Sequence, residues 1–186
     1  MIPLLVLIGS FILLLVARRL NEDLTTDKAG RIAFGVMLLF TGTSHFYLTK
    51  GMVMSMPPFF PAKEALVYFT GVLEIAFALA FMVAKNKPLV AKLLILFLVA
   101  VFPANIYAAL NNIDMENADH SGPGPAYLFF RAPLQLLFIS WVYYFGIQRP
   151  RQTHYRGRLK LVPRHDGRVE VVTGGEKPVE QQRYWD

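Results

Sequence analysis

The sequence predicts an all-α protein, a polytopic membrane helix bundle with about five transmembrane helices. Hydrophobic residues make up 54% of its 186 residues, and its mean hydropathy is +0.39, which is more apolar than a typical soluble domain. The apolar residues occur in long runs that approach the length needed to cross a bilayer. Lysine and arginine gather in alternate loops between these runs, as expected for loops that stay on the cytoplasmic side.

The first apolar segment runs from Ile2 to Ala17 and ends at Arg18 and Arg19. It lacks the basic leading region and the small-residue cleavage site of a signal peptide, so we interpret it as a retained helix. It is short for a bilayer core of about 30 Å, which needs roughly 17–25 residues. A four-span interpretation, in which this segment does not cross the membrane, therefore stays open.

Four further apolar segments follow, each about as long as a transmembrane helix requires. Pro88 opens one of them, and its missing N–H suits the first turn of a helix. The expected helices are residues 32–48, 65–84, 88–110 and 126–147. The chain then divides into an N-terminal helix and loop (1–29), a four-helix membrane core (30–147) and a basic tail (148–186).

The tail contains two stretches that alternate with period two, Arg158 to Val162 and Arg168 to Val172. The residues between them include an Asp-Gly step, which is typical of a hairpin turn. The sequence therefore predicts a small β-hairpin in a soluble, cytoplasmic tail. The basic residues of this tail favour an anchor at anionic lipid head groups, worth roughly 1 kcal/mol for each lysine or arginine near the surface.

The distribution of positive charge predicts the orientation in the membrane. The loops after the first and third segments and the start of the tail are basic, whereas residues 111–125 contain no lysine or arginine. Five spans with the N-terminus outside and the C-terminus in the cytoplasm place every basic loop on the cytoplasmic side. The expected location is therefore the cell membrane, which is the inner membrane in a bacterium with two membranes.

Composition also excludes several kinds of site. The chain has no cysteine, so it has no thiol redox centre, cysteine nucleophile or thiolate-bound metal. A single histidine and a single carboxylate within the apolar segments do not make a metal site, and we expect none. Much of the net charge of +6 lies in the tail, which favours membrane lipids over nucleic acid as the partner.

Five strongly polar residues lie within the apolar segments or near their ends. Such groups are costly in hydrocarbon, so they usually face the interior of a bundle or a water-filled cavity and mark a functional site. The predicted topology places all five in the outer half of the bilayer, on four different helices. They are His45, Glu74, Asn105, Arg131 and Gln135.

Helical spacing supports their convergence. Thr41 and His45 are four residues apart, as are Arg131 and Gln135, and residues at this spacing lie on one helix face. Tyr107 follows Asn105 closely in the same segment. The candidate ligand-binding residues are therefore His45, Glu74, Asn105, Tyr107, Arg131 and Gln135.

A purely structural role is the alternative for each of these residues. Glu74 and Arg131 could form an internal ion pair, because a guanidinium matches a carboxylate. We take the partner of Glu74 as the discriminating observation: contact with Arg131 favours structure or binding, and contact with His45 favours acid–base chemistry. Gly42 and Gly71 favour close helix packing over ligand contact. The aromatic residues Trp141, Tyr143, Tyr144 and Phe145 favour a belt at the inner membrane interface.

The loop over residues 51–61 is unusually apolar for an aqueous loop, and its prolines are incompatible with a continuing helix. We expect it to lie in the membrane interface or to fold back over the bundle. Two functions stay open, an interfacial anchor and a lid over the polar residues. The candidate lid residues are Met56, Pro57, Pro58, Phe60 and Pro61.

Several of these stretches together resemble the DoxX-like integral membrane proteins. The resemblance covers roughly residues 30–147. It rests on Phe40-Thr41-Gly42-Thr43-Ser44-His45-Phe46, Met56-Pro57, Phe60-Pro61, Leu66 to Glu74, Phe102 to Leu110 and Arg131-Ala132-Pro133-Leu134-Gln135. It implies a four-helix membrane core, extended here by the N-terminal helix.

The resemblance also implies quinone-linked or redox-accessory roles. The founding member of that family is similar to a small subunit of a thiosulfate:quinone oxidoreductase, and another relative is linked to amine-dehydrogenase maturation. The absence of cysteine in this chain argues against a thiol relay. No catalytic residue is carried over, because fold resemblance does not by itself imply activity.

We therefore expect a bacterial membrane protein that binds a small amphipathic molecule, a quinone or a lipid, as an accessory component with a membrane redox partner or in a homo-oligomer. Two alternatives remain. One is a membrane oxidoreductase subunit or isomerase that uses His45 and Glu74 as acid and base. The other is a small-solute transporter, which the lack of an evident inverted repeat disfavours.

Overall fold

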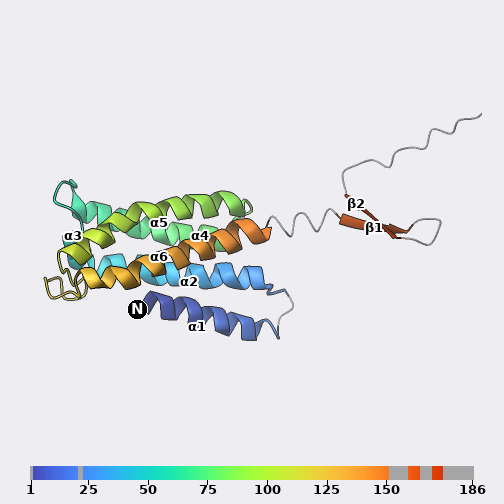
Figure 1. Cartoon of the computed structure of the whole chain (residues 1–186), viewed down its shortest axis with the longest axis horizontal. Helices are drawn as coiled ribbons and strands as arrows, with labels where there is room; N and C mark the ends of the chain where they lie inside the picture. Colours follow the sequence, from blue (N-terminus) through green and yellow to red (C-terminus); the bar gives the residue numbers. More distant parts are fainter. Residues whose placement is uncertain (1, 21–22, 151–158, 164–168, 174–186) are drawn as a thin grey trace, which may run out of the picture.

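The computed structural model describes residues 2–20, 23–150, 159–163 and 169–173, and its main body is an all-α bundle of antiparallel helices (Figure 1). One short helix lies at the end of this bundle. The helices are α1 (Ile2–Ala17), α2 (Thr26–Tyr47), α3 (Thr49–Met54), α4 (Lys63–Val83), α5 (Lys87–Leu110), the 3-10 turn η1 (Pro125–Tyr127), α6 (Leu128–Tyr143) and the π-helical turn η2 (Tyr144–Gln148).

The long helices lie where the apolar segments predicted them, with the largest difference at the start of α2. That helix begins at Thr26, six residues before the predicted start at residue 32. Thr25 caps it, because its side chain accepts a hydrogen bond from the backbone N–H of Lys28 at 3.3 Å. The first turn is polar, so a search for apolar residues misses it. Pro88 lies in the first turn of α5, as predicted, and Asn86 caps that helix by accepting from the N–H of Leu89.

In the described part of the chain, three helical segments are long and apolar enough to cross a membrane: Lys63–Val83, Lys87–Leu110 and Pro125–Gln148. They indicate a multi-pass membrane protein. The shorter α1 is apolar over 16 residues. The 22-residue α2 is less apolar, because it carries a charged first turn and several hydroxyl side chains. The five-span count therefore stays a prediction.

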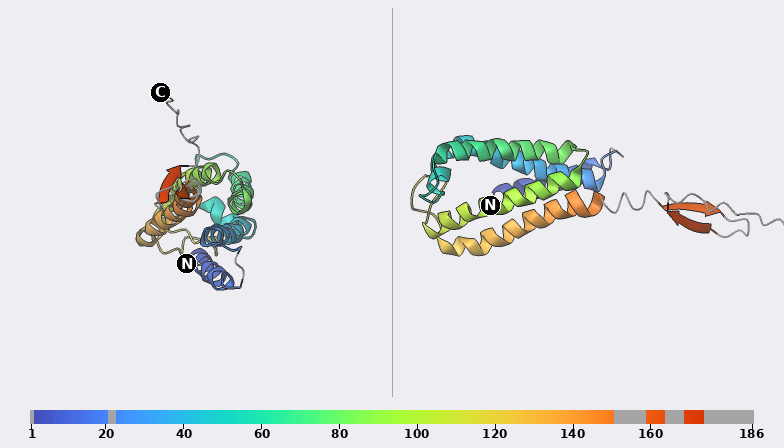
Figure 2. Two further views of the ribbon diagram at one scale, coloured as in Figure 1. Left: turned by 90° about the vertical axis from the view of Figure 1, so that its right-hand side faces the viewer. Right: turned by 90° about the horizontal axis from the view of Figure 1, so that it is seen from above.

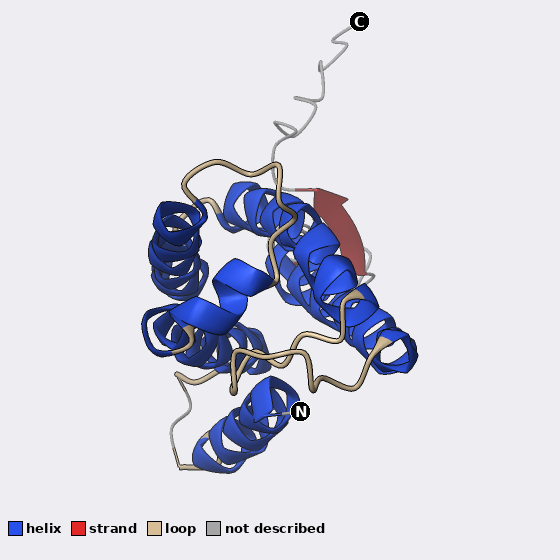
Figure 3. Ribbon diagram, turned by 90° about the vertical axis from the view of Figure 1, so that its left-hand side faces the viewer, coloured by secondary structure: helices blue, strands red, loops and turns tan. Residues whose placement is uncertain are grey.

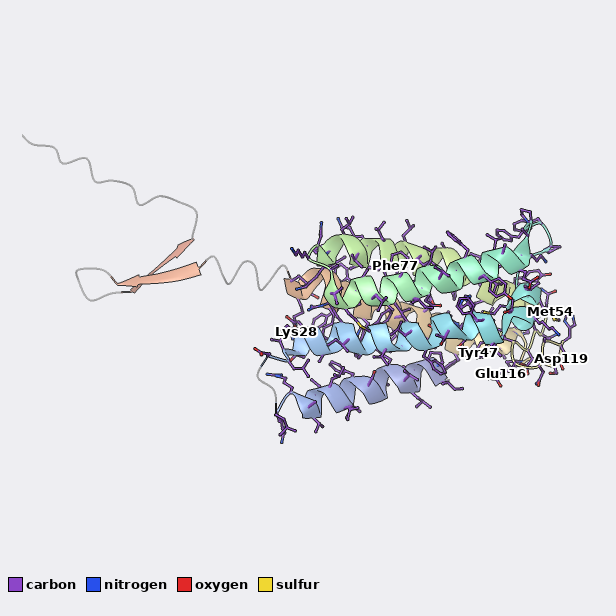
Figure 4. The ribbon with its side chains drawn as sticks, turned by 180° about the vertical axis from the view of Figure 1, so that it is seen from behind. Lys28, Tyr47, Met54, Phe77, Glu116 and Asp119 are labelled. Carbon is purple, nitrogen blue, oxygen red and sulfur yellow. The ribbon has the colours of Figure 1, made fainter. Side chains whose placement is uncertain are left out.

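The two ends of the bundle differ in charge. Helices α1, α4 and α6 end, and α2 and α5 begin, at one end, which we call the basic end (Figure 1). Its residues include Arg18, Arg19, Lys28, Arg31, Lys85, Lys87 and Arg149. The opposite, acidic end holds the loop with Glu116 and Asp119, and these two labels lie far from Lys28 in Figure 4. This separation supports the predicted topology, in which the basic end faces the cytoplasm.

The helices pack as two pairs with α1 added on the outside. Helix α2 packs mainly against α4, and α5 packs against α6, while α1 lies mainly against α2 (Figure 2). The hydrophobic core joins the pairs through Phe34 of α2, whose ring lies 5.9 Å from the rings of both Phe81 on α4 and Phe138 on α6. Leu94 of α5 and Val142 of α6 are also fully buried.

Glycines bring α2 and α4 close together, as predicted for Gly42 and Gly71. A Cβ atom on Gly71 would lie 2.7 Å from the Cβ of His45 and 3.1 Å from the carbonyl oxygen of Gly42. A Cβ on Gly42 would lie 2.9 Å from a side-chain carbon of Ile75. Helix backbones can approach this closely only where side chains are absent, which is common between membrane helices.

The predicted aromatic belt on α6 and η2 is only half correct. Tyr143 and Tyr144 are exposed, as a belt requires. Trp141 and Phe145 instead point into the bundle, where the indole N–H of Trp141 donates to the carbonyl oxygen of Gly30 at 2.9 Å. The ring of Phe11 on α1 lies 4.9 Å from that of Trp141. These inward aromatic residues attach α1 to the bundle, because they fill the space between α1, α2 and η2.

The acidic end is covered by α3 and by the loop over residues 111–124 (Figure 3). Residues 51–54, which we expected to be non-helical, belong to α3, so the prolines end this helix but do not prevent it. Gly51 is buried against the backbone of Met115, and a Cβ at this position would overlap the Met115 carbonyl group. The cover over this end is therefore built mainly from α3 and the acidic loop.

The tail contains two strands, β1 (Leu159–Pro163) and β2 (Val169–Thr173). They pair antiparallel, with Leu159 opposite Thr173 and Pro163 opposite Val169. These are the two stretches whose alternation predicted strands. The expected Asp-Gly turn between them lies outside the described residues.

We predict that Gly71→Val destabilises the protein by about 1–3 kcal/mol, because the new side chain forces α2 and α4 apart. Thermal unfolding in detergent, followed by the helical circular dichroism signal, measures the effect. Gly9→Val is the matched control, since nothing lies within 4 Å of a Cβ at Gly9. Equal stability of the two variants would contradict the close approach.

We also predict that acid loosens the loop after α5. The backbone N–H groups of Asn117 and Glu116 donate to Asp114 and hold the pKa of its carboxyl below the usual value. A lowered pKa in the folded state means that the carboxylate stabilises the loop at neutral pH, and that this stabilisation is lost as the pH falls through the folded-state pKa. The protection factor of the Glu116 amide, which compares its intrinsic exchange rate with its observed rate at the same pH, should therefore fall on acidification. In Asp114→Ala this fall should be absent.

Candidate functional site

The polar side chains of α2 and α4 form one hydrogen-bonded group at the close contact between these helices. The imidazole Nε2 of His45 lies 3.2 Å from Oε2 of Glu74. The hydroxyl of Thr41 donates to the other carboxylate oxygen, Oε1, at 2.6 Å. On its far side, the imidazole Nδ1 of His45 lies 3.0 Å from the carbonyl oxygen of Val67. We call Thr41, His45 and Glu74 the α2–α4 polar group.

These contacts determine where protons can be. We assign a hydrogen to Nδ1 of His45, because the carbonyl oxygen of Val67 can only accept a hydrogen bond. The hydroxyl of Thr70 lies 3.3 Å from the same nitrogen, and backbone carbonyl oxygens of its own helix can accept its hydrogen. The contact between Nε2 and Glu74 then needs one further proton, because two lone pairs would repel each other. That proton lies either on Nε2, giving an imidazolium and a carboxylate, or on Glu74, giving a neutral pair. In both forms the His45–Glu74 pair is neutral overall and holds one transferable proton.

The surroundings of this pair are largely dry. Glu74 is 9% exposed as a residue, and the side chains of His45 and Glu74 are 18% and 12% exposed. A carboxylate buried to this degree needs hydrogen-bond donors, and the hydroxyl of Thr41 and the ring of His45 supply them. Gly42 and Gly71 make this possible, since they let the two helices approach to hydrogen-bonding distance.

A second polar group lies between α5 and α6. The guanidinium Nε of Arg131 donates to Oδ1 of Asn105 at 3.2 Å, and its Nη1 donates to Oε1 of Gln135 at 3.2 Å. Gln135 is buried, and its Nε2 donates in turn to the carbonyl oxygen of Leu98 at 2.6 Å. We call Asn105, Arg131 and Gln135 the α5–α6 polar group.

The ion pair considered for Glu74 and Arg131 is not formed. Within the described part of the chain, Glu74 pairs with His45, and no carboxylate oxygen lies within 4.0 Å of Arg131. Arg131 therefore keeps its positive charge with neutral amide oxygens as partners. Contact of Glu74 with His45 was expected to favour acid–base chemistry, whereas contact with Arg131 was expected to favour structure or binding. The observed contact therefore favours a role in proton exchange over a purely structural or binding role.

The six candidate ligand-binding residues thus fall into two groups, with Tyr107 belonging to neither hydrogen-bonded set. Tyr107 is half-buried, and its backbone carbonyl oxygen accepts from the Nδ2 of Asn111 at 2.8 Å near the end of α5. Among the described residues, no hydrogen bond or ion pair joins the α2–α4 group to the α5–α6 group. A single pocket lined by all six residues stays a prediction.

The candidate lid residues lie between α3 and α4. Pro58, Phe60 and Pro61 are exposed, whereas Met56 and Pro57 are half-buried. The amino group of Lys63 donates to the carbonyl oxygen of Met56 at 3.0 Å and so fixes the start of this segment. Exposed aromatic and proline side chains here fit an interfacial anchor, and the lid function stays a prediction.

Two hollows mark the surface of the bundle. One, of about 660 Å³, lies at the acidic end between α3, the start of α4 and the 115–118 loop. The other, of about 510 Å³, is an open groove between α5 and α6 near the basic end, with Ile95 and Tyr144 among its residues. The sequence did not reveal either hollow, because each depends on how loops and helix ends meet.

Sequence reasoning also assigned no functional role to Arg31, which is buried in the structure.

The helices and their buried polar groups define a multi-pass membrane protein of the helix-bundle class. The chain belongs to the family described as "Domain of unknown function (DUF8561)", whose model matches residues 34–146. That range includes both polar groups and begins within α2. No curated protein and no solved structure matches this chain. The family match falls within the predicted core and indicates no activity.

We predict that Thr41→Val weakens the α2–α4 polar group and destabilises the protein by about 1.5–3 kcal/mol, the usual contribution of a hydrogen bond to a charged group. Thr43→Val is the matched control on the same helix, because Thr43 is exposed and its hydroxyl bonds only to the backbone of its own helix. Thermal unfolding in the same detergent measures both. A similar loss in the two variants would show that the Thr41–Glu74 bond contributes nothing specific.

Proposed function

We propose that this protein binds a small amphipathic molecule, a quinone or a lipid, between its two polar groups and exchanges a proton with it. The protein would act as an accessory component in the cell membrane, with its basic end towards the cytoplasm. The observation that carries this proposal is the contact of Glu74 with His45 and not with Arg131. It leaves a proton-holding pair between α2 and α4. Between α5 and α6 it leaves a guanidinium with no carboxylate oxygen of the described residues within 4.0 Å.

Arg131 favours a ligand with an exposed oxygen. A guanidinium in a low-dielectric bundle gains most from an anionic or strongly polar acceptor. Its partners here are the amide oxygens of Asn105 and Gln135, which orient the planar group but carry no charge. The carbonyl oxygen of a quinone and the phosphate or carboxylate of a lipid are both suitable acceptors, and their apolar parts would remain among the helices.

The His45–Glu74 pair favours a ligand that gains or loses a proton. The pair can give its proton away and take one back without moving either helix, since Nδ1 of His45 stays bonded to Val67 in every form. Quinone reduction consumes protons, so a proton donor beside a bound quinone has a direct use. This proposal agrees with what the DoxX-like resemblance implies, and the relation to that family is itself part of the proposal.

A second candidate function is enzymatic: a membrane oxidoreductase subunit or an isomerase, with His45 and Glu74 as acid and base. The short distance between these two side chains favours it, because a base and its partner must lie within hydrogen-bonding reach. The two functions differ in the fate of the ligand. An enzyme releases an altered molecule, whereas an accessory protein keeps its ligand or passes it on unchanged.

Native mass spectrometry of the protein, extracted with its lipids, tests the binding proposal. We predict that wild-type protein retains a bound small molecule, and that Arg131→Gln and Glu74→Gln retain about tenfold less, since each loses one charge-assisted hydrogen bond. Lys50→Gln is the matched control, because it removes one positive charge near the acidic end without touching either polar group.

The proposal fails if Arg131→Gln and Glu74→Gln unfold at the wild-type temperature and still retain every molecule that the wild type binds. If Glu74→Gln keeps the ligand but no longer converts it, the enzymatic function replaces the accessory one. Comparison of the bound molecule with the molecule released after turnover, again by mass spectrometry, separates these outcomes.

A further inference from the structure

Arg31 lies at the basic end of α2 and is only 3% exposed. Asp27 lies within electrostatic reach of it, but no carboxylate oxygen of the described residues lies within 4.0 Å of its guanidinium. Its guanidinium Nε is fully enclosed and has no hydrogen-bond partner. Among the described residues, no hydrogen bond or ion pair reaches its two terminal nitrogens either. Its terminal nitrogens, unlike Nε, keep a small exposed area at the surface.

The position of Arg31 on α2 indicates where that exposed area lies. Arg31 and Gly35 are four residues apart and share a helix face. Gly35 faces α4, where a Cβ would lie 2.8 Å from Cγ of Met82 and 3.1 Å from the carbonyl oxygen of Ala78. One turn nearer the basic end, Arg31 therefore lies beside the end of α4 and the connection to α5, whose first residue is Lys87.

The charges around Arg31 are mostly positive. Lys87 lies within electrostatic reach of Arg31, Lys28 and Asp27. Asp27 lies within electrostatic reach of Arg31 and Lys87, and its Oδ1 lies 3.7 Å from Nε of Arg149. The starts of α2 and α5 add the positive ends of two helix dipoles at the same place. Several cations therefore share Asp27, and positive charge predominates in the cluster.

Burial of an uncompensated guanidinium is strongly unfavourable, so such a group is usually paired with an anion. We propose that Arg31, Lys28 and Lys87 bind the phosphate of an anionic phospholipid at the basic end of the bundle. A phosphate matches the planar fork of a guanidinium, and the two lysines add charge from the flanking helix starts.

A lipid is the source that the location favours. The cluster lies where the apolar helices α2 and α5 begin, which is the level of the lipid head groups when these helices lie in a bilayer. Anionic head groups are concentrated there, and they attract lysine and arginine beside a membrane helix. This site lies at the opposite end from the polar groups of the proposed function, and it does not depend on that function.

Delipidated protein titrated with phosphatidylglycerol or phosphatidylcholine in detergent, and observed by native mass spectrometry, tests the proposal. We expect wild-type protein to bind one phosphatidylglycerol molecule about tenfold more tightly than phosphatidylcholine. Contacts of a few basic side chains with the anionic head group are enough for a difference of this size. Arg31→Gln should lose this preference. Arg19→Gln should keep it, because Arg19 is an exposed cation at the same end that is absent from the cluster.

A second variant covers the case in which Arg31→Gln does not fold. The double variant Lys28→Gln, Lys87→Gln changes only an exposed and a half-exposed side chain. It should also lose the preference for phosphatidylglycerol over phosphatidylcholine. If Arg19→Gln loses the preference for phosphatidylglycerol as fully as Arg31→Gln does, the effect is general charge attraction and the proposed site is wrong. Equal affinity for both lipids would overturn it too. If inorganic phosphate at millimolar concentration displaces phosphatidylglycerol completely, the site takes free phosphate and the lipid assignment is wrong.

Discussion

The close approach of α2 and α4 is the constraint on which the candidate site depends. Gly42 and Gly71 leave no side chains between the two backbones, so the carboxylate of Glu74 can reach the side chains of Thr41 and His45 directly. In a bilayer, where apolar side chains gain little by leaving lipid, such packing and the hydrogen bonds that it permits hold helices together. The same contact therefore stabilises the bundle and builds its proton-holding pair.

The arrangement of charge follows from this constraint. Because Glu74 is engaged with His45, it does not neutralise Arg131, and the α5–α6 polar group remains cationic. Arg31 repeats the pattern at the other end of the bundle, as a buried guanidinium without a carboxylate partner among the described residues. One buried and one half-buried guanidinium in a small apolar bundle suggest that negatively charged or strongly polar molecules complete the structure.

The helices were predictable because the membrane imposes long apolar runs, and α1, α4 and α5 were located almost to the residue. The start of α2 was missed because its first turn is polar and capped. The polar residues of the site were also predictable, since charge in an apolar run is conspicuous. Their pairing was not: the sequence allows Glu74 to meet either Arg131 or His45, and helix rotation and tilt decide between them. Arg31 was counted as a loop cation because burial depends on neighbours remote in sequence.

The proton position in the His45–Glu74 pair tests the central claim most directly. Nitrogen-15 nuclear magnetic resonance of the His45 ring, with the full-length protein in lipid bilayers, reports which ring nitrogen carries hydrogen. The account predicts that Nδ1 is protonated and bonded to the carbonyl oxygen of Val67. It also predicts that the Nε2 signal shifts in Glu74→Gln. In the control Thr43→Val the Nε2 signal should stay at its wild-type position. An unprotonated Nδ1 would contradict it, because Nε2–H would then donate to a Glu74 carboxylate and the pair would carry a net negative charge. An Nε2 signal that Glu74→Gln leaves unchanged would also contradict it, because His45 would then not contact Glu74.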